Sequence, residues 1–280
     1  MATEEDLVMA AQPENMTSQG PASWGYLRKF ASSVVTIAEM EARKIRHDST
    51  ELWMRSIQPA LWLLVFGEVF NTIRGLAPNG MPYIEFITPG VLAQSVLFVA
   101  IFYGILIVWE RDFGLLTKLL STPSPRSSIV VGKSLAAGVR GVFMGIVVFA
   151  LALIIGINLR FDIADVVAMF AIIILFSMCF AGLSMFLAAL LKTRDRMMGI
   201  GQAITMPLFF ASNAIYPLSL MPRWLQAIAI VNPLSYVVDA MRSVMLTGDY
   251  STLPSDLVAL LVSTAIMISL ASLFLKRLIE

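Results

Sequence analysis

The feature that most restricts this chain is a recurrence of long apolar stretches in which charged side chains are almost absent. A helix needs roughly 20 mostly apolar residues to cross the hydrocarbon core of a bilayer. Of the 280 residues, 58% are hydrophobic and only 14% are charged, which is unlike the balance of a soluble domain. The sequence therefore predicts an all-α polytopic membrane protein with six transmembrane helices. The expected crossings are residues 57–76, 86–109, 141–159, 166–191, 197–222 and 257–275.

The region between the fifth and sixth crossings predicts re-entrant helices. Residues 224–238 are uncharged but too short to span a bilayer, and an Asn-Pro pair interrupts them. Irregular backbone at membrane depth is tolerated only where protein or a water-filled cavity surrounds it. The residues expected to shape this region are Pro217, Asn232, Pro233, Asp239 and Arg242.

The distribution of lysine and arginine predicts the orientation of the helices. With the N-terminus inside, most of the 20 basic residues fall on the cytoplasmic side. The opposite side receives only Arg74, Arg160, Arg223 and Arg242. Because short cytoplasmic loops carry the excess of positive charge, this asymmetry predicts a multi-pass protein of the cell membrane, plasma or inner, with both termini cytoplasmic.

The N-terminal part divides into a tail and an amphipathic helix. Residues 1–23 are polar and acidic, which is typical of a disordered cytoplasmic tail and unlike a signal peptide. Residues 24–50 have apolar side chains along one helical face, although Glu41 also falls there. The basic residues expected at the membrane surface are Arg28, Lys29, Arg43 and Arg46. Residues 51–280 are then expected to form the six-helix transmembrane domain.

The segment 110–123 is too polar to cross a membrane, yet it carries apolar residues at helical spacing. Phe113, Leu116, Leu119 and Leu120 recur three and four residues apart and would share one face of a short helix. We therefore expect a docking helix on the cytoplasmic face of the membrane, where a partner protein exerts force. Its apolar face would meet either that partner or the membrane edge. The residues assigned to this coupling are Glu110, Arg111, Asp112, Phe113, Gly114, Leu116, Lys118 and Leu119.

Several kinds of chemistry are excluded by the residues present. Gly132-Lys133-Ser134 resembles the end of a phosphate-binding loop, but Ser127 stands where that motif needs its first glycine. The single histidine, His47, cannot build a histidine-rich metal site or a catalytic triad. The single cysteine permits no internal disulfide, and a net charge of +1 argues against a nucleic-acid partner. The chain is therefore expected not to be an enzyme, with no catalytic residue and no metal site.

Polar residues inside the apolar stretches are candidates for a substrate path or for contacts between helices. Glu68 is costly in lipid, although it lies near the end of a crossing where it could reach water. Asp239 and Arg242 stand three residues apart, which predicts an ion pair on one helical face. The other polar candidates, which could also hydrogen-bond between helices, are Gln94, Gln202 and Asn213.

The order of these features resembles the permease subunit of type-2 ABC exporters, in its daunorubicin-resistance-like branch. After the second crossing, residues 110–114 read ERDFG and are followed by Thr122-Pro123, similar to the family's E-R-E/D-x-G-T run ending in T-P. Gly132-Lys133 matches the G-K that opens the family's third crossing. Further pieces are YPL at 216–218, PRWL at 222–225, NPLSY at 232–236 and DAMR at 239–242. One departure is Leu115, where the family usually has threonine.

The resemblance implies a fold, partners and a function. It implies an interfacial helix at the N-terminus, a cytoplasmic coupling helix after the second crossing, and re-entrant helices between the fifth and sixth. The partners would be two separate ABC ATPase subunits, a second permease copy or paralogue, and membrane lipids. The chain itself would bind no cofactor, because ATP and magnesium would belong to the partner ATPase. Its cargo would be a hydrophobic drug-like or lipid-like molecule moved out of the cytoplasm or inner leaflet.

Three alternative functions remain open from the sequence. A polysaccharide or glycolipid exporter would share the same permease class. An ion-coupled secondary transporter could use Glu68 as its coupling acid. A purely structural membrane scaffold would not require a charged helix between the second and third crossings.

Overall fold

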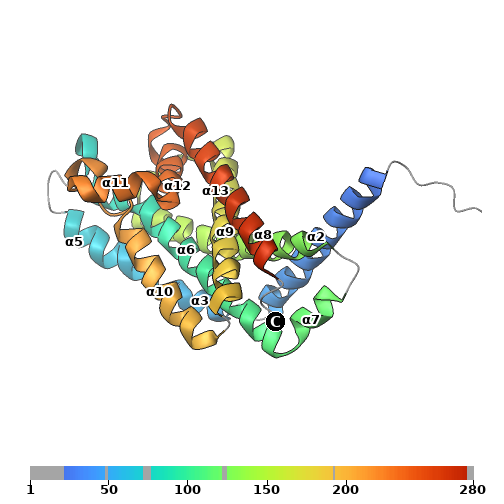
Figure 1. Ribbon diagram of the computed structural model, residues 1–280. Coiled ribbons are helices and arrows are strands. Elements are labelled where there is room, and N and C mark those ends of the chain that lie inside the picture. The colour runs from blue at the N-terminus through green and yellow to red at the C-terminus, as the bar shows by residue number, and fades with distance from the viewer. Residues whose placement is uncertain (1–21, 48–49, 72–76, 122–124, 192, 276–280) are drawn as a thin grey trace, which may run out of the picture.

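The computed structural model describes residues 22–47, 50–71, 77–121, 125–191 and 193–275, and within these ranges the chain is helical with no strand (Figure 1). The predicted tail falls almost wholly outside the described residues. The α-helices are α2 (Ala22–His47), α3 (Thr50–Arg55), α4 (Ile57–Leu61), α5 (Glu68–Asn71), α6 (Tyr83–Asp112), α7 (Leu115–Leu120), α8 (Arg126–Ile155), α9 (Ile163–Leu191), α10 (Arg194–Phe210), α11 (Arg223–Val231), α12 (Pro233–Arg242) and α13 (Leu253–Phe274). The π-helices are η1 (Trp62–Gly67) and η4 (Ser243–Thr247), and the short 3₁₀ turns are η2 (Pro78–Gly80) and η3 (Leu218–Leu220).

Four helices in the described part of the chain are long and apolar enough to cross a membrane: α6, α8, α9 and α13. The sequence predicts six crossings, and the two that fall short are those with disrupted helices. The first predicted crossing is described only as far as Asn71, and within that part the chain passes from α4 through η1 to α5 with helical backbone angles at both junctions. The fifth yields α10, which contains Pro207 and ends after 17 residues. A proline removes one backbone hydrogen bond and obstructs the preceding turn, so Pro207 weakens α10 close to its end.

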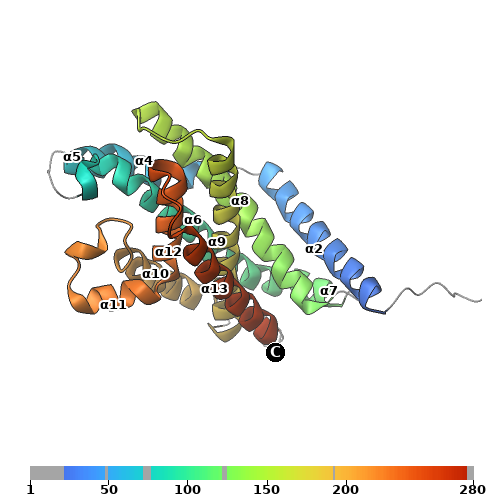
Figure 2. The ribbon, with the colours of Figure 1, turned by 90° about the horizontal axis from the view of Figure 1, so that it is seen from above.

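Helix α6 lies at the centre of the bundle and is the most enclosed of the four span-length helices. It packs against α8 and α9 on one side and against α10 and α12 on the other, while α13 lies along α9. Two clusters of buried apolar side chains follow from this arrangement, one in the half with α12 and one in the half with α7. Seen from above, α2 runs alongside α8 at the edge of the bundle (Figure 2).

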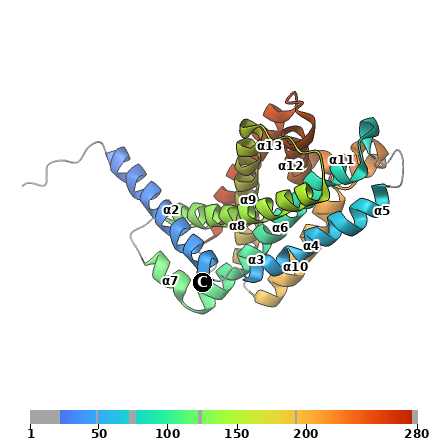
Figure 3. The same ribbon diagram turned by 180° about the vertical axis from the view of Figure 1, so that it is seen from behind.

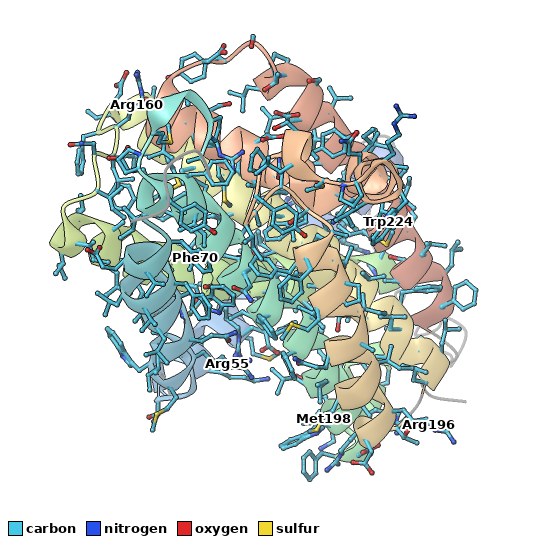
Figure 4. All side chains as sticks on the ribbon, turned by 90° about the vertical axis from the view of Figure 1, so that its left-hand side faces the viewer. Arg55, Phe70, Arg160, Arg196, Met198 and Trp224 are labelled. Carbon is cyan, nitrogen blue, oxygen red and sulfur yellow. The ribbon has the colours of Figure 1, made fainter. Side chains whose placement is uncertain are left out.

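The long helices place two groups of connections at opposite ends of the bundle. The connections α6–α7 and α9–α10 lie at one end, and the connections α8–α9 and α12–α13 lie at the other (Figure 1). The side-chain view shows the same separation, with Arg196 at the lower end and Arg160 at the upper end (Figure 4). The view from behind shows α3, α4 and α5 following one another along the side of the bundle (Figure 3).

Candidate functional site

The charged segment after the second predicted crossing is divided between two helices, so the prediction of one helix over 110–123 is wrong. Residues 110–112 form the last turn of α6, and the chain then breaks before α7 begins. The break occurs at Gly114, whose φ of 72° lies in the left-handed region and whose amide donates to the carbonyl of Arg111 at 2.9 Å. Glycine at a helix C-terminus adopts this conformation without the strain a side chain would add. The predicted stop at Thr122-Pro123 lies outside the described residues.

The turn and α7 divide the apolar residues of the segment between the interior and the surface. Leu116 is fully buried and Leu119 packs against the same core, so these two anchor α7 to its own chain. Phe113 points outward with 69% of its surface exposed, and Leu115 and Lys118 are also exposed. The prediction that Phe113 and Leu116 share one face of a single helix is therefore wrong, because the chain turns at Gly114 between them and only Phe113 is exposed. The exposed apolar surface is Phe113 and Leu115, which we call the exposed turn.

Beneath this turn lies a buried group of four charges that joins α2, α6 and α8. Lys133 Nζ on α8 lies 2.5 Å from Glu110 Oε2 and 3.3 Å from Glu41 Oε1. Lys44 Nζ contacts the same two carboxylates at 3.3 Å and 2.9 Å. Lys133 and Glu41 are almost wholly buried, at 1% and 2% exposure, so their charges need compensation within the protein, while Lys44 is half exposed. We call Glu41, Lys44, Glu110 and Lys133 the charge quartet.

The quartet changes the acidity of Glu41. Burial alone would raise the pKa of Glu41, but the charge of Lys133 and the hydrogen bonds from Lys44 and Lys133 lower it from 4.5 to about 2. A carboxyl group whose pKa is lower in the folded state stabilises the fold fully above its unfolded pKa. That contribution is lost as the pH falls from 4.5 toward 2.

Gly132-Lys133 therefore has a structural role that its sequence pattern did not reveal. A Cβ atom at Gly132 would lie 2.9 Å from Ile37 Cβ on α2, so only glycine permits this close approach of α2 and α8. The close approach lets the neighbouring Lys133 reach Glu41 on α2. Glu41 on the apolar face of the predicted amphipathic helix was the available signal, since a buried charge needs a partner.

A second set of ionic contacts braces the end of α6 against α10. Arg194 Nε and Nη2 lie 2.9 Å and 2.8 Å from Asp112 Oδ2, while Arg111 contacts Oδ1 of the same carboxylate. The Arg194 guanidinium also lies over the rings of Trp109 and Phe113, with its carbon 4.9 Å and 5.8 Å from their centroids. The exposed turn is thus held from one side by the charge quartet and from the other by Arg194.

The remaining predicted site residues are spread over the bundle. On α2, Arg28 and Lys29 are exposed and Arg43 pairs with Glu39 at 2.6 Å, while the side chain of Arg46 lies outside the described residues. Glu68 and Gln202 are exposed on α5 and α10. Gln94 and Asn213 are buried, on α6 and in the loop after α10. The structure does not bring these polar residues together into one site.

The region between α10 and α13 is organised around Asn232. Its side chain caps α12 by accepting from the Leu234 amide, and its Nδ2 donates to the carbonyls of Leu208 and Ala211 at the end of α10. Pro233 occupies the first turn of α12, and Pro217 precedes η3.

The predicted ion pair between Asp239 and Arg242 is confirmed, with 2.9 Å between Arg242 Nη1 and Asp239 Oδ1. Arg242 also donates to the carbonyl of Asn213, and its guanidinium carbon lies 4.2 Å from the centroid of the Phe86 ring. This arginine therefore connects α12 to α6 and to the loop after α10.

Comparison with known proteins identifies the architecture. Residues 32–246, well over half of the chain, match the ABC-2 type transporter family. The chain belongs to this family. The ABC-2 chain is 24% identical over 253 residues to the daunorubicin resistance ABC transporter permease DrrB1 of Streptomyces coeruleorubidus, covering 85% of this chain and 87% of the relative. It is 25% identical over 219 residues to the inner membrane transport permease YadH of Escherichia coli K12, covering 74% and 82%.

A third relative is a protein of Cyanophora paradoxa named as a transport permease, 29% identical over 191 residues. The match covers 66% of this chain and 64% of that relative, so the chain spans less than two thirds of its length. Taken together, the matches place the chain in the ABC-2 type transporter family, and the relatives named here are called transport permeases.

Proposed function

We propose that this ABC-2 permease exports a hydrophobic drug-like or lipid-like molecule, driven by ABC ATPase subunits that dock on the exposed turn. The observation that carries the proposal is the arrangement of Phe113 and Leu115. Both are exposed, yet the turn that presents them is held by buried or paired charges on two sides. An apolar surface on a rigid support is suited to receive force from another protein, because movement of the turn must move the helices joined to it.

The proposed topology has six crossings with both termini in the cytoplasm. The bias of lysine and arginine supports this orientation, since it places the α7 end of the bundle inside. In this arrangement α3, α4, η1 and α5 together make the first crossing, and α10 with the turn after it makes the fifth. Helix α2 lies along the membrane surface, and α11 and α12 form the re-entrant pair. Two permease chains, identical or paralogous, assemble with two ATPase subunits.

The energy source in this proposal is ATP with magnesium bound by the partner. The place of Lys133 supports this assignment. A phosphate-binding loop offers free backbone amides to the nucleotide, whereas Gly132 and Lys133 lie inside α8, where helical hydrogen bonds occupy those amides. The lysine is already engaged by two carboxylates.

Transport follows from motion of the braced helices. Closure of the two ATPase subunits displaces the exposed turn, and the charge quartet transfers that displacement to α2 and α8. The contact through Arg194 transfers it to α10. A partner shifts the equilibrium between two states only by its different affinity for them, so the docking contacts must differ between the inward and outward states. Packed helix interfaces convert such small shifts into a discrete change.

An apolar groove supports a hydrophobic cargo. It has a volume of about 940 Å³ between α10 and α11 and is lined by Pro207, Phe210, Trp224, Ile228 and Val231. Trp224 lies in the half of the bundle away from Arg196 (Figure 4). The name of the Streptomyces coeruleorubidus relative, a daunorubicin resistance permease, agrees with a drug-like molecule.

Replacing Phe113 with alanine tests the docking surface. Because this side chain is exposed, the change should leave the fold intact while weakening binding of the ABC ATPase by about tenfold, the effect expected of a central aromatic contact. The measurement is the dissociation constant of the purified permease and a co-expressed ATPase. Phe161→Ala is the matched control, since Phe161 is 60% exposed at the opposite end of the bundle. If the two variants bind the ATPase with equal affinity, the exposed turn is not part of the interface.

A further inference from the structure

A polar cavity of about 360 Å³ lies at the end of the bundle opposite α7, between α11, α12, η4 and the start of α13 (Figure 1). Its wall contains three aspartates and one arginine, together with serine and threonine hydroxyls. The charged and polar residues on which the argument rests are Ser235, Asp239, Arg242, Asp249 and Asp256. None of them belongs to the exposed turn or to the charge quartet.

Three buried polar atoms in this wall have no hydrogen-bond partner among the described residues. They are Arg242 Nε, together with Asp256 Oδ2 and Ser235 Oγ on side chains that are each 5% exposed. A buried polar group without a partner costs about 1–3 kcal/mol, so native structures rarely keep one without a reason. Asp256 lies in the first turn of α13, where the helix dipole favours a negative charge. No cation among the described residues lies within ion-pair distance of this carboxylate.

The aspartates around the cavity differ in whether a cation neutralises them. Asp239 is neutralised by Arg242 at 2.9 Å, whereas Asp249 and Asp256 form no ion pair with any described residue. Within the described chain, no three acidic, histidine or cysteine residues converge as a metal-ligand set. The cavity is therefore acidic, with its carboxylates spread around the wall and not gathered at one point.

The opposite wall is apolar. Leu218, Ala229 and Ile230 contribute aliphatic surface, and Tyr236 donates its hydroxyl to the Ile230 carbonyl at 2.6 Å, so its ring is held in the wall. An aromatic face attracts cations and also packs against hydrocarbon. The loop that carries Asp249 is also held in place. The Tyr250 hydroxyl donates to the Asp165 carboxylate, and the same carboxylate accepts from Arg160 Nε at 3.0 Å.

We propose that this cavity binds an ammonium group carried on an apolar body, with Asp256 as its main counter-ion. The acidic wall and the Asp256 carboxylate, which forms no ion pair with a described residue, select the positive charge. The aliphatic wall with Tyr236 selects the apolar body. A lipid amine headgroup and a free organic amine share this chemistry. The proposal concerns binding alone and goes beyond the proposed export, because it requires neither an ATPase nor a direction of transport.

Calorimetric titration of the purified full chain, in phosphatidylglycerol nanodiscs, tests the proposal with 2-phenylethylammonium as probe. Its neutral counterpart, 2-phenylethanol, should bind at least about tenfold more weakly, which corresponds to the loss of one ion pair. Asp256→Asn should weaken ammonium binding by a similar factor. Asp162→Asn, an exposed change of the same charge at the same end but outside the cavity, should alter it less than about twofold.

A second variant and a second lipid composition guard against a misfolded Asp256→Asn chain and distinguish the two possible sources of the amine. Ser255→Phe fills the exposed mouth of the cavity without touching the core, and it should also weaken binding of the probe. The proposal is overturned if the alcohol binds as tightly as the ammonium, or if both Asp256→Asn and Ser255→Phe bind the probe like the parent chain. Phosphatidylethanolamine is then added to the nanodiscs. If it competes with the probe, the ligand of the cavity is a lipid headgroup, and if it does not compete, the ligand is a free amine. Failure here leaves the ATPase-docking proposal standing, since no ATPase is present.

Discussion

Replacing Lys133 with methionine is expected to destabilise the chain by about 3–5 kcal/mol, the cost of leaving a buried ion pair with only one partner. Lys133 is the buried cation between Glu41 and Glu110, and Lys44 is half exposed and cannot neutralise both carboxylates alone. The two acidic side chains would then keep only the half-exposed Lys44 as a counter-ion. We expect α2 to detach from α8, which thermal unfolding in detergent and proteolysis of α2 would both detect.

Two further variants distinguish the loss of this buried ion pair from the effect of replacing any lysine by methionine. Lys118→Met alters an exposed side chain on α7 and should change the free energy of unfolding by less than about 0.5 kcal/mol. Adding Glu41→Gln and Glu110→Gln to the Lys133→Met chain should recover part of the stability, because no buried charge is left unpaired. If Lys133→Met unfolds like the parent chain, the charge quartet does not hold α2 in place.

Replacing Asn232 with alanine should cost about 2–4 kcal/mol, combining a lost helix cap with two buried carbonyls left without a donor. Asn232 caps α12 and donates to the end of α10, so one side chain fixes the angle between these elements. The measurement is again thermal unfolding of the purified chain.

Aspartate at the same position isolates the two contributions. Asn232→Asp keeps the acceptor that caps α12 but lacks the amide donors, so its stability should fall between those of the parent and Asn232→Ala. An Asn232→Asp chain as stable as the parent would mean that the contacts to Leu208 and Ala211 contribute nothing.

The helical fold could be predicted because it depends on local pattern. The apolar stretches became α6, α8, α9 and α13, and three-residue spacing was enough to predict the Asp239–Arg242 pair. The disrupted stretches were less predictable. Pro59 and Pro207 stand inside expected crossings, and the helices there are short or of π type. Whether such pieces act together as one crossing depends on the bilayer around them.

The candidate site was only partly predictable because its contacts join distant residues. Lys133 and Glu41 are separated by 92 positions, and no local pattern connects them. The turn at Gly114 was missed for a different reason. Helical spacing continues through ERDFGLLTKLL, and the spacing alone does not reveal that glycine takes a positive φ there. This one missed turn separated Phe113, which is exposed, from Leu116, which is buried, although both were expected on one helical face.

The most direct test of the docking proposal is crosslinking from position 113. Cys179 is the only cysteine of the chain and is buried, so a Cys179→Ser chain gives a background without thiols. Phe113→Cys in that background, treated with a short thiol-to-amine crosslinker in membranes containing the ABC ATPase, should yield a covalent permease–ATPase product whose amount changes with ATP. Phe161→Cys should yield none. Equal crosslinking from the two positions, or none from position 113, would contradict the assignment of the exposed turn as the ATPase contact.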